Sequence, residues 1–457
     1  MVHRTFYNGI RGLVGSGAVF PIAERLERRA MRARERDLAA DMSVPFGERR
    51  LRSWNRLIDI VRFAAVNVPY YRDLFAGIGF DPELLVRDSR YLAEIPVLTK
   101  DIIRSQGDRM LRDDHADYRK HVSKTGGSTG PSMCVTYDQH AADSSSAVTR
   151  YARAQVGAGP AKSELHFAAR FQDRIPIRAR MREQIKCLAN NRFNLTFASF
   201  SSDELNRLWQ RINAIRPYLV HGHPSTLYQL ALHVAARAGQ NRAFRIFESS
   251  GEMLTQVQRD VIERVFKCKV INRYGLAEAG VLAYQVDPAD DAMLFFDPVA
   301  WPEVVEVEFG GELPQLAESR TGELVVTPFA NRMMPLIRYS TGDIATLREA
   351  PNGFYIQNMV GRVHDVVNIA GVPVPTHHVQ DVLDRIGGIR EFQIESDAHR
   401  PVFRIVPESD AAKDPIQHGL RQLWADSIGI EFIEAYALKL QGWRSKFHHL
   451  VKPPDAE

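Results

Sequence analysis

A segment in the first third of the chain has the residue types that bind phosphate. It reads Thr125-Gly126-Gly127-Ser128-Thr129-Gly130 and continues with Pro131-Ser132. Glycines let a backbone turn so that several N–H groups converge on one anion, and hydroxyl groups add further donors. The segment is not a Walker A loop, because no Gly-Lys-Ser/Thr follows at the required spacing. Taken alone, it fits a phosphate-binding loop and a surface turn equally well.

Two later segments carry side chains suited to a nucleotide. Residues 272–278 follow a short apolar run, and within them Tyr274 could stack on a purine while Glu278 could hold magnesium. A second segment, residues 338–343, ends in Asp343 after a predicted tight turn. An aspartate at such a position can accept hydrogen bonds from both hydroxyls of a ribose. The alternative interpretation of Asp343 is a turn residue that satisfies its own backbone.

Three shorter segments add weaker signals. Residues 249–252 (Ser-Ser-Gly-Glu) end a strand-like run, residues 361–365 lie where the pattern of the chain changes, and Lys446 stands in a basic stretch almost at the end. Strands commonly end in glycine and a polar residue, and a late basic stretch is usually a solvated tail. These segments therefore indicate a function only in combination with the others.

The elements that must position these residues are predicted to alternate between helix and strand from about 120 to 280. One helix carries apolar residues at helical spacing, namely Leu205, Leu208, Ile212 and Ile215. Another is predicted to begin near Thr255. This alternation is typical of a large α/β domain. Residues 22–115 are predicted to be mostly helical, with a break at 67–72.

Beyond residue 300 the pattern changes to strands. Val305, Val307 and Phe309 alternate with glutamates, and Thr321-Gly322 is predicted to turn into a strand over residues 323–326. This pattern predicts a half-exposed antiparallel sheet added to the α/β body.

The last hundred residues are predicted to form a small α+β unit. Two apolar stripes predict helices over 379–386 and 416–424, the second with Asp414 as its N-cap and Pro415 in its first turn. Strand-like segments give an α-β-β-α-β order; they span residues 389–395, 401–406 and 431–438. The predicted fold class is α/β, divided into an N-terminal helical extension (1–60), a large domain of several subdomains (61–360) and a C-terminal lid (361–457).

Composition limits the class of protein. With 457 residues, 45% hydrophobic and 25% charged, the chain should form two or three globular domains. Its three cysteines lie far apart with no CxxC pair, which argues against a disulfide framework or a zinc ribbon. The apolar run 13–23 is broken by glycines and a proline, and no clean signal cleavage site follows. We therefore expect a cytoplasmic protein without a transmembrane segment.

The net charge of +4 is small, and most of the arginine excess lies early, between Arg25 and Arg36. Glutamates interleave with these arginines, which predicts a solvated helix face. The alternative is a segment that contacts a membrane surface or a nucleic acid. We expect no nucleic-acid partner.

In order and spacing, five of these segments together resemble the adenylate-forming superfamily of acyl-CoA synthetases, peptide-synthetase adenylation domains and luciferases. Thr125–Gly130 is similar to the phosphate loop, and Tyr274–Glu278 to the tyrosine-glycine-x-threonine-glutamate motif, with Ala277 in place of threonine. The remaining matches are Tyr339–Asp343 with the ribose motif, Gly361–Asp365 with the hinge motif and Lys446 with the C-terminal catalytic lysine.

A finer resemblance is to the phenylacetate–CoA ligase family, especially its relatives linked with capsular polysaccharide genes. Three segments carry it: Val68-Pro69-Tyr70-Tyr71-Arg72, Ile95-Pro96-Val97-Leu98-Thr99-Lys100 and His221-Gly222-His223-Pro224-Ser225. The resemblance runs from about residue 60 to Lys446, nearly the whole chain.

The resemblance implies a reaction in two steps. A substrate carboxylate attacks the α-phosphate of ATP and pyrophosphate leaves; the mobile lid then rotates, and the thiol of CoA attacks the activated carbonyl. Catalytic roles fall on Lys446, Glu278 and Thr129, with Lys446 bridging the carboxylate and the α-phosphate and Glu278 holding Mg²⁺.

The resemblance also assigns binding residues. Those for the nucleotide are Thr125, Gly126, Gly127, Ser128, Thr129, Gly130, Gly251, Glu252, Tyr274, Gly275, Asp343 and Arg362. Those for the acid are His221, Gly222, His223, Ala279 and Gly280. The hinge falls at His364.

Three departures from the family pattern change these expectations. His364 stands where an acidic residue or lysine is usual, so lid rotation could depend on pH. Pro131-Ser132 replaces the basic residue that often follows the phosphate loop, which leaves backbone amides and hydroxyls as the donors. His221 and His223 have no third or fourth ligand nearby for zinc, and a purely structural loop is the alternative to a pocket role.

We expect an AMP-forming ligase of an aromatic or medium-sized carboxylic acid, acting as a monomer or homodimer with ATP, Mg²⁺ and CoA. Three alternatives stay open. The acyl group could pass to an amine, AMP could stay on its acceptor as in an adenylyltransferase, or the chain could be a non-catalytic scaffold. The presence of Lys446, Glu278 and Asp343 argues against the scaffold.

Overall fold

The computed structural model describes residues 2–124, 133–168, 177–197, 199–287, 289–306, 319–362, 366–396, 400–441 and 446–451, and its fold class is α/β, as predicted. The α-helices are α1 (Val2–Val14), α2 (Phe20–Leu26), α3 (Met31–Ser43), α4 (Phe46–Asn67), α5 (Pro69–Ile78), α6 (Lys100–Gln106), α7 (Gln139–Gln155), α8 (Ile177–Ala189), α9 (Ser202–Ile215), α10 (Pro224–Ala238), α11 (Gln256–Phe266), α12 (Thr376–Ile386) and α13 (Lys413–Trp424). A π-helical segment, η1 (Gly15–Val19), joins α1 to α2. Short 3₁₀ helices are η2 (Pro82–Val86), η3 (Ser89–Glu94), η4 (Gly107–Met110), η5 (His115–Asp117), η6 (Asp410–Ala412), η7 (Ala425–Ser427) and η8 (Ala435–Ala437).

The strands from β1 to β11 are β1 (His121–Lys124), β2 (Cys134–Tyr137), β3 (Glu164–Ala168), β4 (Arg192–Thr196), β5 (Leu219–Gly222), β6 (Ile246–Ser249), β7 (Lys269–Leu276), β8 (Gly280–Tyr284), β9 (Met293–Phe295), β10 (Ala300–Val305) and β11 (Ser319–Pro328). The later strands are β12 (Tyr339–Ala350), β13 (Gly353–Arg362), β14 (Val366–Ile369), β15 (Val372–Pro375), β16 (Ile389–Glu395), β17 (Val402–Pro407), β18 (Gly429–Phe432), β19 (Leu440–Gln441), β20 (Lys446–Phe447) and β21 (Leu450–Val451). In the described residues, no helix combines the length and the apolar character that a membrane crossing requires.

One large mixed sheet organises the body of the molecule, in the order β10-β11-β12-β13-β9-β8-β7-β6-β5-β3-β4. The strands from β7 to β4 pair in parallel, whereas β7 and every later neighbour towards β10 pair antiparallel. Strand β7 belongs to both halves, because residues 269–272 pair with β6 and residues 273–276 pair with β8. The predicted nucleotide segment 272–278 therefore begins at the junction of the two halves.

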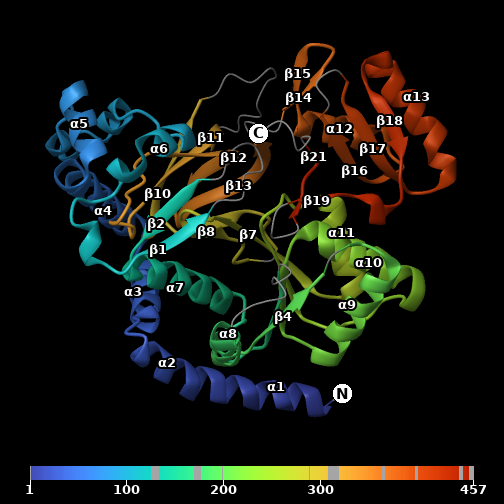
Figure 1. Ribbon diagram of the computed structural model, residues 1–457, viewed down its shortest axis with the longest axis horizontal. Coiled ribbons are helices and arrows are strands. Elements are labelled where there is room, and N and C mark those ends of the chain that lie inside the picture. Colours follow the sequence, from blue (N-terminus) through green and yellow to red (C-terminus); the bar gives the residue numbers. More distant parts are fainter. Residues whose placement is uncertain are drawn as a thin grey trace.

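The parallel half is a three-layer structure, because successive residues of each strand point to opposite faces. Leu219 and Ile246 pack with α3 and α7 on one face. Their sequence neighbours Val220 and Phe247 pack with α9, α10 and α11 on the other. Figure 1 shows this arrangement, with α7 and the helices α9–α11 on opposite sides of the strands. Strands buried on both faces explain the apolar runs that the sequence places between its amphipathic helices.

The antiparallel half packs on the N-terminal helices α4 and α5. Leu57 and Val61 of α4 share a core with Leu324 of β11 and Ile356 of β13. The predicted break at residues 67–72 is confirmed only at Val68, because α4 ends at Asn67 and α5 already begins at Pro69.

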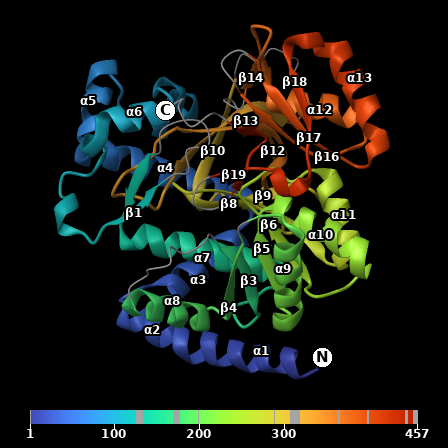
Figure 2. The same ribbon diagram turned by 45° about the vertical axis from the view of Figure 1, so that its right-hand side comes forward.

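The C-terminal residues form a separate core around a four-stranded sheet, β18-β17-β16-β21, covered by α12 and α13. The predicted order α-β-β-α-β is confirmed by α12, β16, β17, α13 and β18. In both Figure 1 and Figure 2 this unit lies beside α10 and α11. Val406, Leu438 and Phe447 join the same apolar cluster as those helices, so the contact is a packed one.

Several local predictions were wrong. Thr321-Gly322 is not a turn, because β11 already begins at Ser319, and most of β11 and β12 is buried instead of half-exposed. Asp414 does not cap α13, because the helix starts one residue earlier, at Lys413. The strand predicted at 431–438 lies at Gly429–Phe432.

The segment from Arg25 to Arg36 is also not one solvated helix face. Helix α2 ends at Leu26 and α3 begins at Met31, and several charges point inward. Arg29 Nε donates to the buried Asp143 at 2.6 Å, and Arg150 Nε donates to Glu35 at 2.7 Å. These pairs attach α3 and the turn before it to α7. Local sequence cannot reveal such tertiary ion pairs.

Candidate active site

The carboxyl ends of β5 and β6 bring two of the predicted segments together. In parallel strands these ends meet at one edge of the sheet, where open α/β folds bind ligands. Gly222 at the end of β5 pairs with Ser249 at the end of β6. His223, directly after β5, has its Nδ1 2.9 Å from the carbonyl oxygen of Ser250. The expected substrate segment and the expected nucleotide segment are therefore in contact.

Glu252 links this edge to the C-terminal residues. Its Oε2 accepts a hydrogen bond from Ser225 Oγ at 2.6 Å, in the turn that starts α10. Its Oε1 accepts one from the backbone N–H of Phe447 at 2.8 Å. The bond to Phe447 fixes the backbone of β20, which contains Lys446, next to the end of β6.

Tyr274 and Asp343 form a direct contact between two motifs that lie 69 residues apart. The Tyr274 hydroxyl donates to Asp343 Oδ2 at 2.9 Å, and both residues are buried. Thr341 Oγ1 accepts a hydrogen bond from the Asp343 backbone N–H at 3.1 Å and donates to the carbonyl of Leu324 at 2.7 Å. Asp343 thus lies within β12, its backbone N–H is bonded to the Thr341 hydroxyl, and its carboxylate accepts a hydrogen bond from Tyr274 of β7.

Asp343 also lies beside the next motif along the chain. In the antiparallel pair β12–β13, Asp343 is the register partner of Arg362. The sequence separates these two residues by 19 positions, and the β12–β13 hairpin brings them opposite each other. The described part of Arg362 is its backbone.

Tyr339 is a site residue that the sequence reasoning did not single out. Its hydroxyl donates to Glu278 Oε1 at 2.7 Å, and its ring is fully buried. Burial, together with the charge of Glu278, raises the pKa of Tyr339, so that the hydroxyl stays a donor. Its place in the ribose motif was the available signal, but nothing in the sequence pairs it with Glu278.

Two of the expected pocket residues lie just after Glu278. Gly280 has φ +76, and a Cβ added there would come within 2.3 Å of Ser145 Oγ on α7. Glycine is therefore required at this position for both conformation and space. Ala279 is half-buried and packs against the core of the antiparallel half.

His221 belongs to a buried cluster of charges on the α7 side of the sheet. Arg153 of α7 donates from Nε to Glu248 Oε2 at 2.9 Å and from Nη1 to Glu164 Oε2 at 2.7 Å. His221 Nδ1 lies 3.1 Å from Glu248 Oε2, and His166 Nε2 lies 3.0 Å from Glu164 Oε2. The two imidazole rings are neighbours, with centroids 4.9 Å apart.

Burial sets the protonation of this cluster. Burial lowers the pKa of His166 to about 3, although its bond to Glu164 opposes the shift. Burial also lowers the pKa of His221, helped by the charges of Arg273 and Arg153. Burial alone would raise the pKa of Glu164, but Arg153 and His166 outweigh it and lower that pKa to about 2. At neutral pH the cluster therefore holds two carboxylates and two neutral imidazoles.

Some expected residues lie outside the described part of the chain. They are the whole phosphate segment, Thr125, Gly126, Gly127, Ser128, Thr129 and Gly130, and the hinge residue His364. Lys446 is described through its backbone only. Within the described ranges, no group of three or more His, Cys, Asp or Glu side chains could hold a metal ion.

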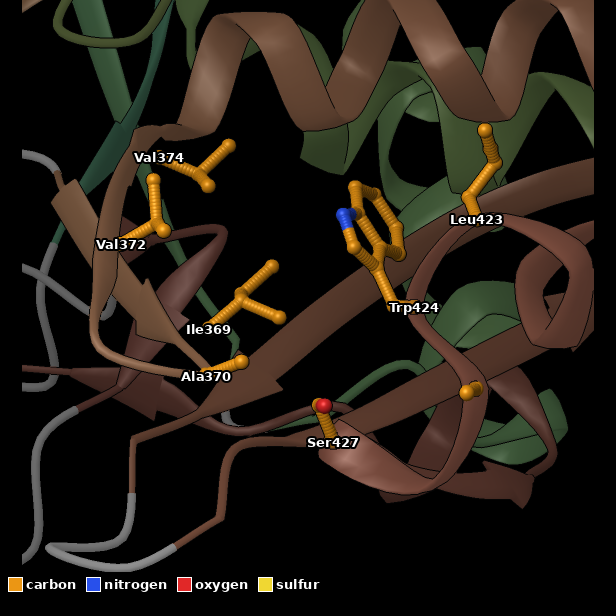
Figure 3. A pocket seen from close by; sticks show the side chains of 8 residues that line it. Ile369, Ala370, Val372, Val374, Leu423, Trp424 and Ser427 are labelled. Carbon is orange, nitrogen blue, oxygen red and sulfur yellow. The ribbon is translucent and has the colours of Figure 1, made fainter.

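A cavity of about 380 Å³ lies elsewhere, in the C-terminal unit. Figure 3 shows Val372, Val374 and Ile369 of the β14–β15 hairpin on one side of it and Trp424 and Leu423 of α13 on the other. None of the predicted site residues lines it.

Comparisons with known proteins agree with the resemblance predicted from the sequence. No family model matches the chain. It is 25% identical over 411 residues to the phenylacetate-coenzyme A ligase of Thermus thermophilus, an alignment that covers 82% of this chain and 89% of that protein. The Escherichia coli phenylacetate-coenzyme A ligase is 26% identical over 332 residues, with 70% and 72% covered. Protein CapK of Staphylococcus aureus is 24% identical over 337 residues, with 71% of each chain covered.

Among solved structures, 2-hydroxyisobutyryl-CoA ligase in its postadenylation state superposes with a TM-score of 0.67 at 18% identity, covering 90% of this chain and 91% of that one. The same enzyme in its thioesterification state gives a TM-score of 0.56 at 19% identity, with 90% and 91% covered. These similarities confirm the resemblance predicted from the sequence and show that the fold is shared with this CoA ligase.

Proposed function

We propose that this chain, a relative of the phenylacetate–CoA ligases with the fold of adenylate-forming enzymes, is an AMP-forming acid–CoA ligase. It converts a carboxylic acid and ATP into an acyl-adenylate and pyrophosphate. It then transfers the acyl group to the sulfur of CoA and releases AMP. The observation that carries this proposal is the contact of Tyr274 with Asp343, which joins two motifs of an adenylate site in one buried pair.

In the first step the protein positions groups and neutralises charge. Tyr274 and Gly251 flank the adenine, while Asp343 and Arg362 bind the ribose. The register that places Asp343 opposite Arg362 across β12 and β13 supports their joint binding of the ribose. The loop Thr125–Gly130 cradles the departing phosphates, and Lys446 bridges the carboxylate and the α-phosphate. The bond from Phe447 to Glu252 supports this role, because it ties the lysine's strand to the end of β6.

Glu278 is the proposed ligand of Mg²⁺ that arrives with ATP. Magnesium prefers oxygen ligands and usually takes one or two protein carboxylates together with substrate phosphates. Glu278 fits this use, because Tyr339 orients its Oε1 and the side chain is only half-buried. The ion would offset negative charge on the phosphates.

In the second step the lid, residues 361–457, turns about His364 so that CoA reaches the adenylate. The separate core of the C-terminal unit supports a rigid lid. The boundary falls at the end of β13, the last strand of the large sheet before that unit. The large domain would then span 61–360, with residues 1–60 as its helical extension. This division falls inside α4 (Phe46–Asn67), which packs in the core of the antiparallel half on both sides of it.

The acid is proposed to be aromatic or medium-sized, in a pocket at His221, Gly222, His223, Ala279 and Gly280. The phenylacetate-coenzyme A ligases among the relatives support an aromatic acid, and CapK supports a role beside capsular polysaccharide genes. We place the reaction in the cytoplasm, consistent with three free cysteines. The enzyme would act as a monomer or homodimer.

The test is pyrophosphate release from ATP and Mg²⁺ with a panel of acids, with and without CoA. The proposal predicts release that depends on one class of acid and accelerates with CoA. Release that an amine accelerates instead would favour amide formation, and no release with any acid would contradict adenylation.

A further inference from the structure

Helix α1 packs on the protein through its polar face, the reverse of the usual packing of an amphipathic helix. Asn8 is only 6% exposed, and its Nδ2 donates to the carbonyls of Ile215 and Arg216 at 2.8 and 3.2 Å. Arg11 Nη1 donates to Asn191 Oδ1 at 2.6 Å. A Cβ at Gly12 would lie 1.9 Å from the carbonyl oxygen of Ala161, so this side of the helix touches backbone. These contacts fix which face of α1 is free.

The free face of α1 is apolar. Its exposed side chains are Phe6, Tyr7, Ile10, Leu13 and Val14, of which Leu13 is 67% exposed. The spacing i, i+1, i+4, i+7, i+8 places them on one stripe of a helix. In a globular protein such a stripe normally faces the core, and a large exposed apolar face marks an interaction site.

Neighbouring elements also expose apolar side chains. Ile22 and Leu26 of α2 are exposed, the latter at 79%. Helix α8, which packs against α1, η1 and α2, exposes Ile177, Met181 and Ile185 at intervals of four residues. Figures 1 and 2 both show α1 and α2 along the lower edge of the molecule, with α8 beside them and the C-terminal unit at the opposite end. We call these helices and η1 the basal surface.

The charges of the basal surface favour one kind of partner. Basic residues outnumber acidic ones seven to two over α1, η1, α2 and α8. Both acidic residues are already paired within the protein: Glu24 is buried and accepts from Arg32 at 2.5 Å, and Glu183 accepts from Arg192 at 2.5 Å. Of the basic residues, Arg11 faces the protein and Arg182 pairs with Glu27 at 3.0 Å. Arg178, Arg180 and Lys186 of α8 are exposed.

Exposed apolar side chains beside exposed cations are the signature of helices that lie in the interface of an anionic bilayer. A second copy of the chain would instead oppose the same positive charge across an isologous contact. We propose that the basal surface docks the enzyme on anionic lipid membranes, with the apolar stripe of α1 inserted at the headgroup level.

The experiment is co-sedimentation of the full chain with vesicles of phosphatidylcholine that contain about one-third phosphatidylglycerol, beside vesicles of phosphatidylcholine alone. We expect at least about ten-fold tighter partition onto the anionic vesicles, weakened by salt. The double variant Phe6→Glu/Leu13→Glu should lose at least about ten-fold in that partition. Its matched control is Leu51→Glu/Val66→Glu on α4, which charges two equally exposed apolar side chains and should bind as wild type does.

A second variant, Arg178→Glu/Lys186→Glu, keeps the apolar stripe and should weaken binding to anionic vesicles alone. Thermal unfolding checks that each variant folds. Wild-type protein that does not bind, or a Phe6→Glu/Leu13→Glu variant that binds as well as wild type, would overturn the proposal. A wild-type dimer in sedimentation velocity that this variant dissociates would assign the surface to a second copy and would also overturn it.

Discussion

The Oε1 atom of Glu252 accepts a hydrogen bond at 2.8 Å from the backbone N–H of Phe447, 195 residues later in the chain. Because Lys446 immediately precedes Phe447, this bond fixes the proposed catalytic lysine's backbone beside the end of β6. Glu252 is itself held by Ser225, so one carboxylate joins three segments of the proposed site.

Replacing Glu252 by alanine should slow adenylate formation. Hydrogen bonds to a charged group contribute about 1.5–3 kcal/mol, so we expect a loss of about 10- to 100-fold in the rate of acid-dependent pyrophosphate release. Glu349→Ala removes a carboxylate from an exposed ion pair with Arg50 and should leave the rate unchanged. Equal rates for Glu252→Ala and wild type would show that the contact does not position Lys446.

Tyr339→Phe removes the hydroxyl that orients Glu278 and leaves the ring in place. Partners of a metal ligand typically change metal affinity about 10- to 100-fold, so the Mg²⁺ concentration for half-maximal rate should rise by about ten-fold. A magnesium titration of pyrophosphate release measures it. The control is Tyr436→Phe, at an exposed tyrosine of η8. A wild-type magnesium dependence in Tyr339→Phe would contradict the role of Glu278 as a Mg²⁺ ligand that Tyr339 orients.

Tyr274→Phe should weaken ATP binding more than it slows the chemistry. The loss of one hydroxyl bond to the buried Asp343 leaves that carboxylate less constrained, and about 1–2 kcal/mol corresponds to a rise of about 5- to 30-fold in the KM for ATP. Steady-state kinetics at saturating acid give both constants. A fall in kcat with an unchanged KM for ATP would contradict a nucleotide-binding role for this pair.

Local patterns in the sequence predicted individual elements well. Thr255 caps α11 through a capping box with Gln258, and α9 follows its apolar spacing from Ser202 to Ile215. The motif segments were visible for the same reason, since each is local. The bonds that assemble the site were not, because Tyr339–Glu278 and Phe447–Glu252 join residues 61 and 195 positions apart. The sequence also could not predict that α1 packs through its polar face. Periodicity reveals an apolar face but not which face of the helix contacts the protein.

The buried cluster around Arg153 should make the protein less stable in acid. His166 titrates near pH 3 in the folded protein, below its unfolded value of about 6.5, so unfolding takes up a proton between these values. The free energy of unfolding should therefore fall as pH drops below 6.5, by about 1.4 kcal/mol per pH unit for each such histidine. Glu164, with its pKa lowered to about 2, adds a further loss between pH 4.5 and 2.

Urea unfolding at several pH values between 7 and 5 measures this slope. His166→Gln should reduce it by about one proton, since glutamine can donate to Glu164 but does not titrate. His418→Gln, at an exposed position of α13, should keep the full slope. Identical slopes for wild type and His166→Gln would mean that His166 is not held neutral.

The most direct measurement is detection of the acyl-adenylate itself. Purified enzyme is mixed with ATP, Mg²⁺ and one acid at a time, without CoA, quenched after a single turnover and examined by mass spectrometry. We predict an acyl-AMP with at least one class of aromatic or medium-sized acid, and its loss in a folded Lys446→Ala variant. No acyl-AMP from wild type with any acid, or an undiminished yield from Lys446→Ala, would contradict the proposed reaction or the role of its lysine, respectively.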